Sequence, residues 1–270
     1  MTRHSRTITK NPDLKDWSKE YANKVNVRFF ADAAAALSAS GTGNAGLMMI
    51  GLVGQRDIPG HTLRVAQSVL RWDIRPSLWS HAFLVSASFP MQKKNLDKSA
   101  SPRSVPLLEV PLWPRSGRFP KPGDNGAGTA RLADYSDRRI DANVALLAFK
   151  MTDQEADKVQ QRARDFNFDR LRYNLWDCLC IWQAYLWSNG AAPNPLRNDV
   201  PIPSASFIEM AFEAIGLDIT PMANTRNTAP EHLWNAACWW HEAFMKLKRG
   251  VRGYYVLRDK GCSIESTDEV

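Results

Sequence analysis

Apolar side chains recur at helical spacing through residues 202–219, at Phe207, Ile208, Ala211, Phe212 and Ile215. Pro203 opens the segment and Gly216 follows its last apolar turn. This pattern predicts an amphipathic helix of about three turns that stops at the glycine. Glu209 and Glu213 fall outside the apolar stripe, so they are expected to face solvent.

Other segments alternate between strand-like and helix-like patterns. The segment at 79–88 predicts a strand with His81, Phe83 and Val85 on one face and Ala82 and Leu84 on the other. Further strands are expected at 46–54, 105–113, 142–151 and 251–264, and helices at 31–39, 61–72, 152–167, 172–187 and 229–248. The pattern indicates an α+β fold in which a small antiparallel sheet packs against segregated helices.

Local signals refine this outline. Pro106 and Pro111 favour an edge position for the strand at 105–113. Residues 114–139 are rich in Pro, Gly and Asp and are interpreted as a long loop. Thr152 and Glu155 form a capping-box pattern. We divide the chain into an N-terminal extension (1–44), one domain (45–264) with insertions near 88–104 and 114–140, and a short tail (265–270).

Composition and charge limit the classes of function that the chain could have. The chain has 270 residues, a net charge of +7 and 44% hydrophobic residues, which suits one large domain. Its Lys and Arg residues are spread along the chain without interleaved aromatic residues, so nucleic-acid binding is not expected. The longest uncharged run, 33–55, is too polar for an integral membrane segment. The N-terminus lacks a signal-peptide pattern, which predicts synthesis in the cytoplasm and, for action outside the cell, export by a specialised secretion system.

The cysteines and histidines give no metal or cofactor signal. Cys178 and Cys180 lie in a tryptophan-rich helical stretch, where no helix end lowers a thiol pKa, and they are interpreted as buried core thiols. No zinc-type cysteine spacing occurs. His232 and His241 lie outside any H-E-x-x-H pattern, which excludes a zincin. No metal or cofactor is therefore expected.

Three polar residues have positions that suit nucleophilic catalysis. Ser204 lies at the start of the helix at 202–219, where unpaired N–H groups and the helix dipole stabilise negative charge. His81 lies on a strand and could act as general base and acid, and Glu109 could orient its ring. Plainer interpretations stay open: Ser206 and Glu209 match a capping box, His81 could be a buried structural histidine, and Asp124 could replace Glu109.

Five short motifs, in order, resemble the circularly permuted NlpC-type (YiiX-like) branch of the papain-like fold. The motifs are Ser80-His81-Ala82-Phe83, Leu108-Glu109-Val110, Tyr173-Asn174-Leu175, Ser204-Ala205-Ser206-Phe207-Ile208 running to Gly216-Leu217-Asp218, and Ala229-Pro230-Glu231-His232-Leu233. The resemblance as a whole covers roughly residues 45–260. The resemblance implies a permuted papain-like hydrolase that cleaves amide bonds of peptidoglycan stem peptides, with position 204 as nucleophile, His81 as base and Glu109 as orienting group.

The resemblance fails at one position, because the family nucleophile is cysteine and this chain has Ser204. A helix dipole does not ionise a serine hydroxyl, so the chain as written is expected to be nearly inactive. Two explanations are open. Ser204 replaces a cysteine, giving an inactive Cys-to-Ser form, or the protein is naturally a serine form or pseudoenzyme.

The sequence leaves three functions to compare. The leading hypothesis is a cysteine-type amidase that acts on peptidoglycan or peptides, in the manner of a secreted antibacterial toxin with an immunity or secretion-machine partner. The second is a lipid or ester acyl hydrolase or acyltransferase of the same fold. The third is a binding module with a degenerate site, in which Ser204 is native.

Overall fold

The structure, a computed structural model, describes residues 26–39, 46–85, 102–111, 128–168, 203–221, 223–244, 250–257 and 264–266. Several predicted features lie outside these ranges. They include the helix expected at 172–187, with Tyr173, Cys178 and Cys180, and the alternative carboxylate Asp124.

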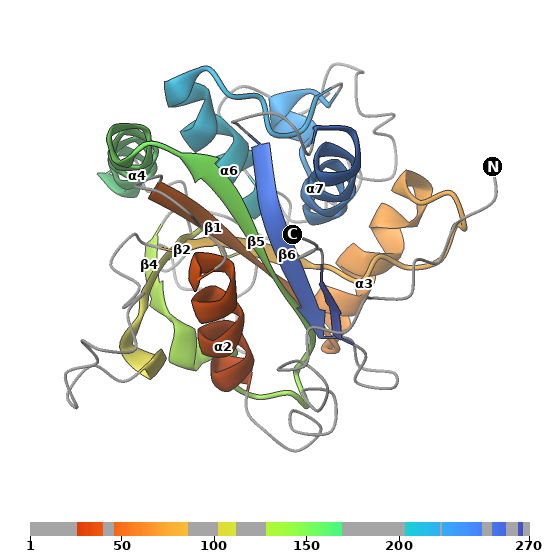
Figure 1. The fold of residues 1–270 in the computed structure, drawn as a ribbon. Helices are drawn as coiled ribbons and strands as arrows, with labels where there is room; N and C mark the ends of the chain where they lie inside the picture. Colours follow the sequence, from red (N-terminus) through yellow and green to blue (C-terminus); the bar gives the residue numbers. More distant parts are fainter. Residues whose placement is uncertain are drawn as a thin grey trace.

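A seven-stranded sheet forms the centre of the fold, with the strand order β4-β3-β2-β1-β5-β6-β7 (Figure 1). Every neighbouring pair is antiparallel. The strands are β1 (Gly46–Gln55), β2 (His81–Val85), β3 (Pro106–Glu109), β4 (Gly128–Arg131), β5 (Asp141–Met151), β6 (Gly250–Leu257) and β7 (Ile264–Ser266). The predicted α+β class, with an antiparallel sheet packed against helices, is confirmed.

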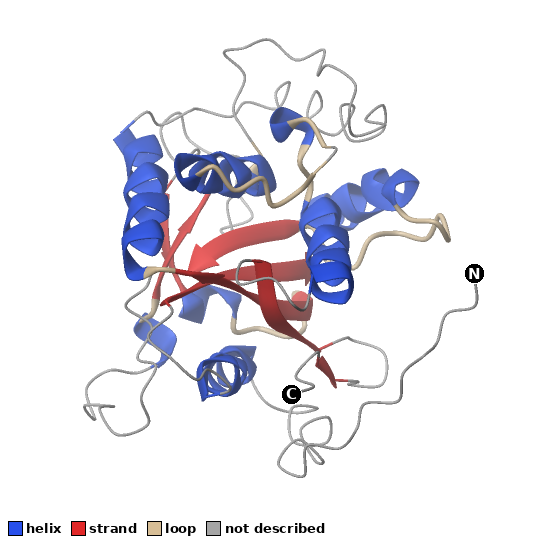
Figure 2. Cartoon of the chain, turned by 45° about the horizontal axis from the view of Figure 1, so that its top comes forward, coloured by secondary structure: helices blue, strands red, loops and turns tan. Residues whose placement is uncertain are grey.

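Helix α2 (Asn26–Ala39) covers one face of this sheet (Figure 2). Its Phe29, Phe30 and Leu37 are fully or almost fully buried and join a core cluster with Phe83 and Val85 of β2. The helix begins earlier than the 31–39 expected from sequence. Although it lies in the segment assigned to an N-terminal extension, it supplies part of the core of the sheet.

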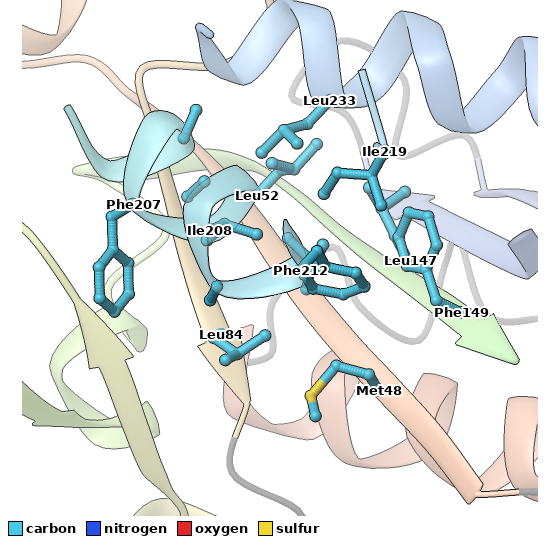
Figure 3. Close-up of a cluster of buried hydrophobic side chains, with 14 of the residues drawn as sticks. Met48, Leu52, Leu84, Leu147, Phe149, Phe207, Ile208, Phe212, Ile219 and Leu233 are labelled. Atoms are coloured by element: carbon cyan, nitrogen blue, oxygen red, sulfur yellow. The ribbon is translucent and has the colours of Figure 1, made fainter. Parts of the chain in front are cut away.

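Three helices share the opposite core cluster: α4 (Asp153–Phe168), α6 (Ser204–Phe212) and α7 (Pro230–Phe244). In Figure 3, Phe212 of α6 points toward Phe149 and Leu147 of β5. Phe207 of α6 packs edge to face against Phe166 of α4. Because Phe83 and Leu84 belong to different clusters, the predicted alternation of β2 is confirmed. Burial of this large apolar stripe is what holds α6 against the sheet.

Beyond α6 the chain turns as predicted. A short 3-10 turn, η5 (Glu213–Ile215), extends the helix, and Gly216 then adopts a left-handed conformation with φ of 65°. Glycine suits this position because it lacks the Cβ atom that makes positive φ unfavourable. The capping box of α4 is also confirmed, since Thr152 N donates to Glu155 Oε2 and Glu155 N donates to Thr152 Oγ1.

Two sequence predictions about β3 and its surroundings were wrong. Strand β3 is not an edge strand, because β4 pairs with it on its outer side, with Pro106 opposite Arg131. Residues 114–139 are not all loop, since they contain β4 and the 3-10 turn η4 (Leu132–Tyr135). Pro106 is tolerated because it is the first residue of a short strand, where one missing donor costs little.

The connection between β1 and β2 contains helix α3 (Ile58–Ala66) and the 3-10 turn η2 (Gln67–Leu70). Asp57 caps α3 by accepting a hydrogen bond from Gly60 N at 3.0 Å. Ala66 is buried, and Leu63 and Leu70 pack against the core, as the helical pattern predicted. Val69 is 52% exposed, because the chain tightens into η2 before reaching it.

Candidate active site

His81 and Glu109 meet at the ends of two paired strands. His81 is the first residue of β2, and Glu109 is the last residue of β3, opposite Phe83. His81 Nε2 lies 3.0 Å from Glu109 Oε2, and the two side chains are only 6% and 7% exposed. The sequence predicted this pair, and the structure brings its two members together.

Tyr135 completes this cluster, and sequence reasoning missed it. Its hydroxyl donates a hydrogen bond to Glu109 Oε2, the same oxygen that His81 contacts. Its ring stacks on the His81 imidazole, with centroids 5.6 Å apart and planes 11° from parallel. Asn26 of α2 in turn donates to the main-chain oxygen of Tyr135 at 3.1 Å. The imidazole is therefore held by a hydrogen bond at its edge and by an aromatic ring on its face.

This arrangement decides which imidazole nitrogen could act as a base. An ionised carboxylate only accepts hydrogen bonds. His81 Nε2 must therefore be the protonated nitrogen, which donates a hydrogen bond to Glu109 Oε2. In the neutral ring Nδ1 then holds the free lone pair. No residue within the described ranges makes a hydrogen bond to Nδ1. The cluster thus fixes one tautomer and leaves Nδ1 to accept a proton.

Ser204 is the first residue of α6, after Pro203, whose φ of −63° and ψ of 157° are extended. No side-chain cap covers this helix end, so its first N–H groups lack helical partners. The Ser204 hydroxyl accepts a hydrogen bond from Ala82 N at 3.2 Å and is 1% exposed. The structure therefore places Ser204 against the residue that follows His81.

His81, expected to act as the base for position 204, makes no hydrogen bond to the Ser204 hydroxyl in this structure. Ser204 bonds to the main chain of β2, and His81 bonds to Glu109. The reason is geometric. Helix α6 packs on the face that carries Ala82, whereas the His81 ring lies with Phe83 and Tyr135 on the other face. Ser204 is attached to Ala82, at a point of β2 that precedes the first residue paired with β3.

The predicted capping box of α6 was wrong, and so was the solvent exposure of Glu209. Ser206 Oγ donates to Thr228 O at 3.2 Å. Glu209 is 2% exposed and accepts hydrogen bonds from Ile219 N at 3.1 Å and Thr220 Oγ1 at 2.8 Å. Burial raises the pKa of Glu209 to about 8, and neighbouring Asp218 adds to the increase. Glu209 therefore ties α6 to the segment after Gly216.

Glu231 and His232, at the start of α7, have structural contacts. Glu231 accepts a hydrogen bond from Ser77 Oγ at 2.6 Å and pairs with Arg71 at 3.2 Å. His232 Nδ1 accepts from Ala229 N at 3.0 Å, and burial lowers the pKa of His232 to about 4. Both residues stabilise the start of α7 and lie outside the His81–Glu109 cluster.

The described part of the chain contains no group of three or more His, Cys, Asp or Glu residues that could hold a metal ion. Cys238, on α7, is an unbridged cysteine of intermediate exposure. Among the helices described, none combines the length and apolar character needed to cross a membrane.

Comparison with known proteins adds no relative. No protein-family model matches the chain, and searches of curated proteins and of solved structures also gave no match. The features that bear on function are therefore the contacts around His81, Glu109, Tyr135 and Ser204.

Proposed function

We propose that the chain is a permuted papain-like (NlpC-type) amide hydrolase in which position 204 carries the nucleophile. The observation that carries this proposal is the pairing of two half-sites at the start of β2. One half is the His81–Glu109 pair, with its Nδ1 left as a base. The other is the N-terminus of α6, where Ser204 touches the neighbouring main chain at 3.2 Å.

The chemistry of such a site divides among these groups. A thiol at position 204 would lie at the positive end of α6 and next to an imidazolium at His81, both of which favour a thiolate. The thiolate would attack the carbonyl carbon, and His81 would give its proton to the leaving amine as the C–N bond breaks, which leaves a thioester. Water, giving a proton to His81, would then cleave the thioester, release the carboxylic acid and regenerate the thiolate. Glu109 keeps the ring oriented and stabilises its charged form. Uncapped N–H groups at the start of α6 would stabilise the oxyanion.

With serine at position 204, the nucleophile described above is missing its thiol. Its hydroxyl is not ionised by a helix dipole, and here its oxygen accepts from Ala82 N rather than donating to the imidazole. The chain as written is therefore proposed to be nearly inactive. The proposed substrates are peptidoglycan stem peptides, and the proposed setting is a secreted antibacterial protein. A lipid or ester substrate is the alternative for the same machinery.

Hydrolysis by three matched variants tests this proposal. The chain as given, Ser204→Cys, and Ser204→Cys with His81→Ala would be incubated with purified cell-wall peptides and with ester and acyl substrates. We expect activity only in Ser204→Cys, with a loss of at least about 100-fold when His81 is also removed. Inactivity of Ser204→Cys on every substrate class would contradict the proposal.

One observation favours a second function, a binding module with a degenerate site. Ser204 is 1% exposed and its oxygen is already used by Ala82 N, which suits a structural role for a native serine. In that case Ser204→Cys would gain no activity and would lower stability, because sulfur is a weaker hydrogen-bond acceptor than oxygen. The codon at position 204 in the source gene separates the two functions, since a cysteine codon supports the enzyme.

A further inference from the structure

Large apolar side chains are exposed along the connection between β1 and β2. We call the five residues concerned the 58–74 surface: Ile58 is 84% exposed, Val65 42%, Val69 52%, Trp72 76% and Ile74 74%. Isolated exposed apolar residues are ordinary on protein surfaces, but these five occur within one short segment of the chain. Such a concentration indicates a surface that binds a partner.

The backbone of this surface is also strained. Ile74 has φ of 53°, and among the described non-glycine residues it is the one with positive φ. A β-branched residue is poorly suited to this conformation, which asparagine or glycine adopts more readily. The chain therefore holds an unfavourable residue in a conformation that exposes its apolar side chain by 74%. Strain of this kind persists at binding positions more often than at structural ones.

Positive charges outnumber negative charges around the 58–74 surface. Residues 56–76 contain four arginines and two aspartates. Asp57 is used to cap α3, and Arg71 pairs with Asp73 at 2.8 Å and with Glu231 at 3.2 Å. Arg56 and Arg75 are exposed. The surface therefore combines apolar side chains with cationic groups, which is the combination that suits an anionic lipid interface.

The position of the surface links it to the candidate site. Strand β1 ends where α3 begins, and the chain returns to the sheet at His81, which is paired with Val53. In Figure 1, α3 lies at the periphery of the molecule beside the sheet. A partner bound to the 58–74 surface would thus lie near the end of the sheet where β2 starts.

We propose that the 58–74 surface docks the protein on the surface of an anionic lipid bilayer. Trp72 and Ile74 would insert at the level of the headgroups, and Arg75 would contact anionic lipid. A second copy of the chain is a less suitable partner, because a two-fold contact would bring the cationic groups of both copies together. This proposal does not depend on the hydrolase activity.

Sedimentation of the full chain with vesicles tests the proposal. We would use vesicles of phosphatidylcholine, with and without phosphatidylglycerol, at low and high salt. We expect binding to the anionic vesicles at low salt, at least about 10-fold weaker binding to the neutral ones, and weaker binding at high salt. Trp72→Ser combined with Ile74→Asn should lower binding by at least about 10-fold.

A charge-matched pair gives the control. Arg75→Gln should weaken binding about five-fold, as expected for one cation near a charged membrane, whereas Arg162→Gln on the distant helix α4 should not. Thermal melting checks that each variant folds. If the double variant does not fold, the comparison of Arg75→Gln with Arg162→Gln tests the proposal instead. Absence of binding to anionic vesicles would overturn the proposal. So would equal effects of the two arginine variants, or a dimer in solution that the double variant dissociates.

Discussion

The hydroxyl oxygen of Ser204 lies 3.2 Å from the main-chain nitrogen of Ala82, which follows His81 directly in β2. This bond attaches the start of α6 to the start of β2 although 122 residues separate the two positions. It places Ser204, the start of α6 and the residue after His81 within one small region. It also shows how the serine is used here, as an acceptor for a main-chain N–H that β3 does not reach.

Tyr135→Phe should destabilise the fold while keeping the aromatic stacking on His81. The variant removes the hydroxyl that donates to Glu109 Oε2 and leaves the ring in place. A buried hydrogen bond to a charged group contributes about 1.5–3 kcal/mol, so the free energy of unfolding should fall by about that amount in urea denaturation. In a double-mutant cycle, Glu109→Gln should reduce the effect of Tyr135→Phe. Full additivity of the two changes would mean that the hydroxyl does not support Glu109.

Glu209→Gln should reduce the pH dependence of stability between about pH 5 and 8. The pKa of Glu209 is raised from 4.5 to about 8 in the folded protein, mainly by burial. As pH rises from 4.5, the unfolded chain loses this proton before the folded chain does, so the wild-type free energy of unfolding falls. The loss ends near the folded pKa and reaches about 1.4 kcal/mol per pH unit for one proton.

The measurement is urea denaturation of both proteins at a series of pH values. Glutamine resembles the protonated side chain, so the variant should lack this part of the slope. Since the comparison is a difference between two proteins, titrating groups that do not interact with Glu209 cancel, and Asp218, which does interact with it, contributes to the difference. Identical slopes in wild type and variant would show that Glu209 is ionised in the folded protein at neutral pH.

His232→Gln should protect the protein against acid. Burial lowers the pKa of His232 from 6.5 to about 4, so the folded protein keeps this imidazole neutral. Below pH 6.5 the unfolded chain binds a proton at this histidine and the folded chain does not. The free energy of unfolding therefore falls as the pH is lowered to about 4. Glutamine cannot titrate and can still accept from a main-chain N–H near the helix start. Thermal melting between pH 7 and 4 should show a smaller decrease for the variant than for wild type.

Local patterns along the sequence predicted several elements correctly. Apolar periodicity identified α6, and β5 was expected at 142–151 and observed at Asp141–Met151. Alternation along 79–88 separated His81 and Phe83 from Ala82 and Leu84. These predictions succeeded because the periodicity of a strand or helix follows directly from which face it buries.

The errors arose where distant contacts decide the structure. Glu209 looks like a solvent-facing residue until the segment after Gly216 folds back and supplies Ile219 N and Thr220 Oγ1. Tyr135 lies in a stretch that reads as loop, and its role depends on η4 reaching His81 and Glu109 from far along the chain. No local signal specifies either contact. A buried polar residue can be recognised only when its partners are known.

The reactivity of a thiol at position 204 tests the central claim most directly, without any assumption about substrate. Ser204→Cys, alone and with His81→Ala, would be treated with limiting iodoacetamide at pH 6, and alkylation at each cysteine would be followed by peptide mass spectrometry. Cys238 is the internal reference, since it is unbridged and partly exposed. We predict that the introduced thiol reacts at least about 10-fold faster than Cys238, and that His81→Ala removes most of this advantage. A rate no faster than that of Cys238, unchanged by His81→Ala, would contradict the claim that position 204 and His81 form one nucleophilic site.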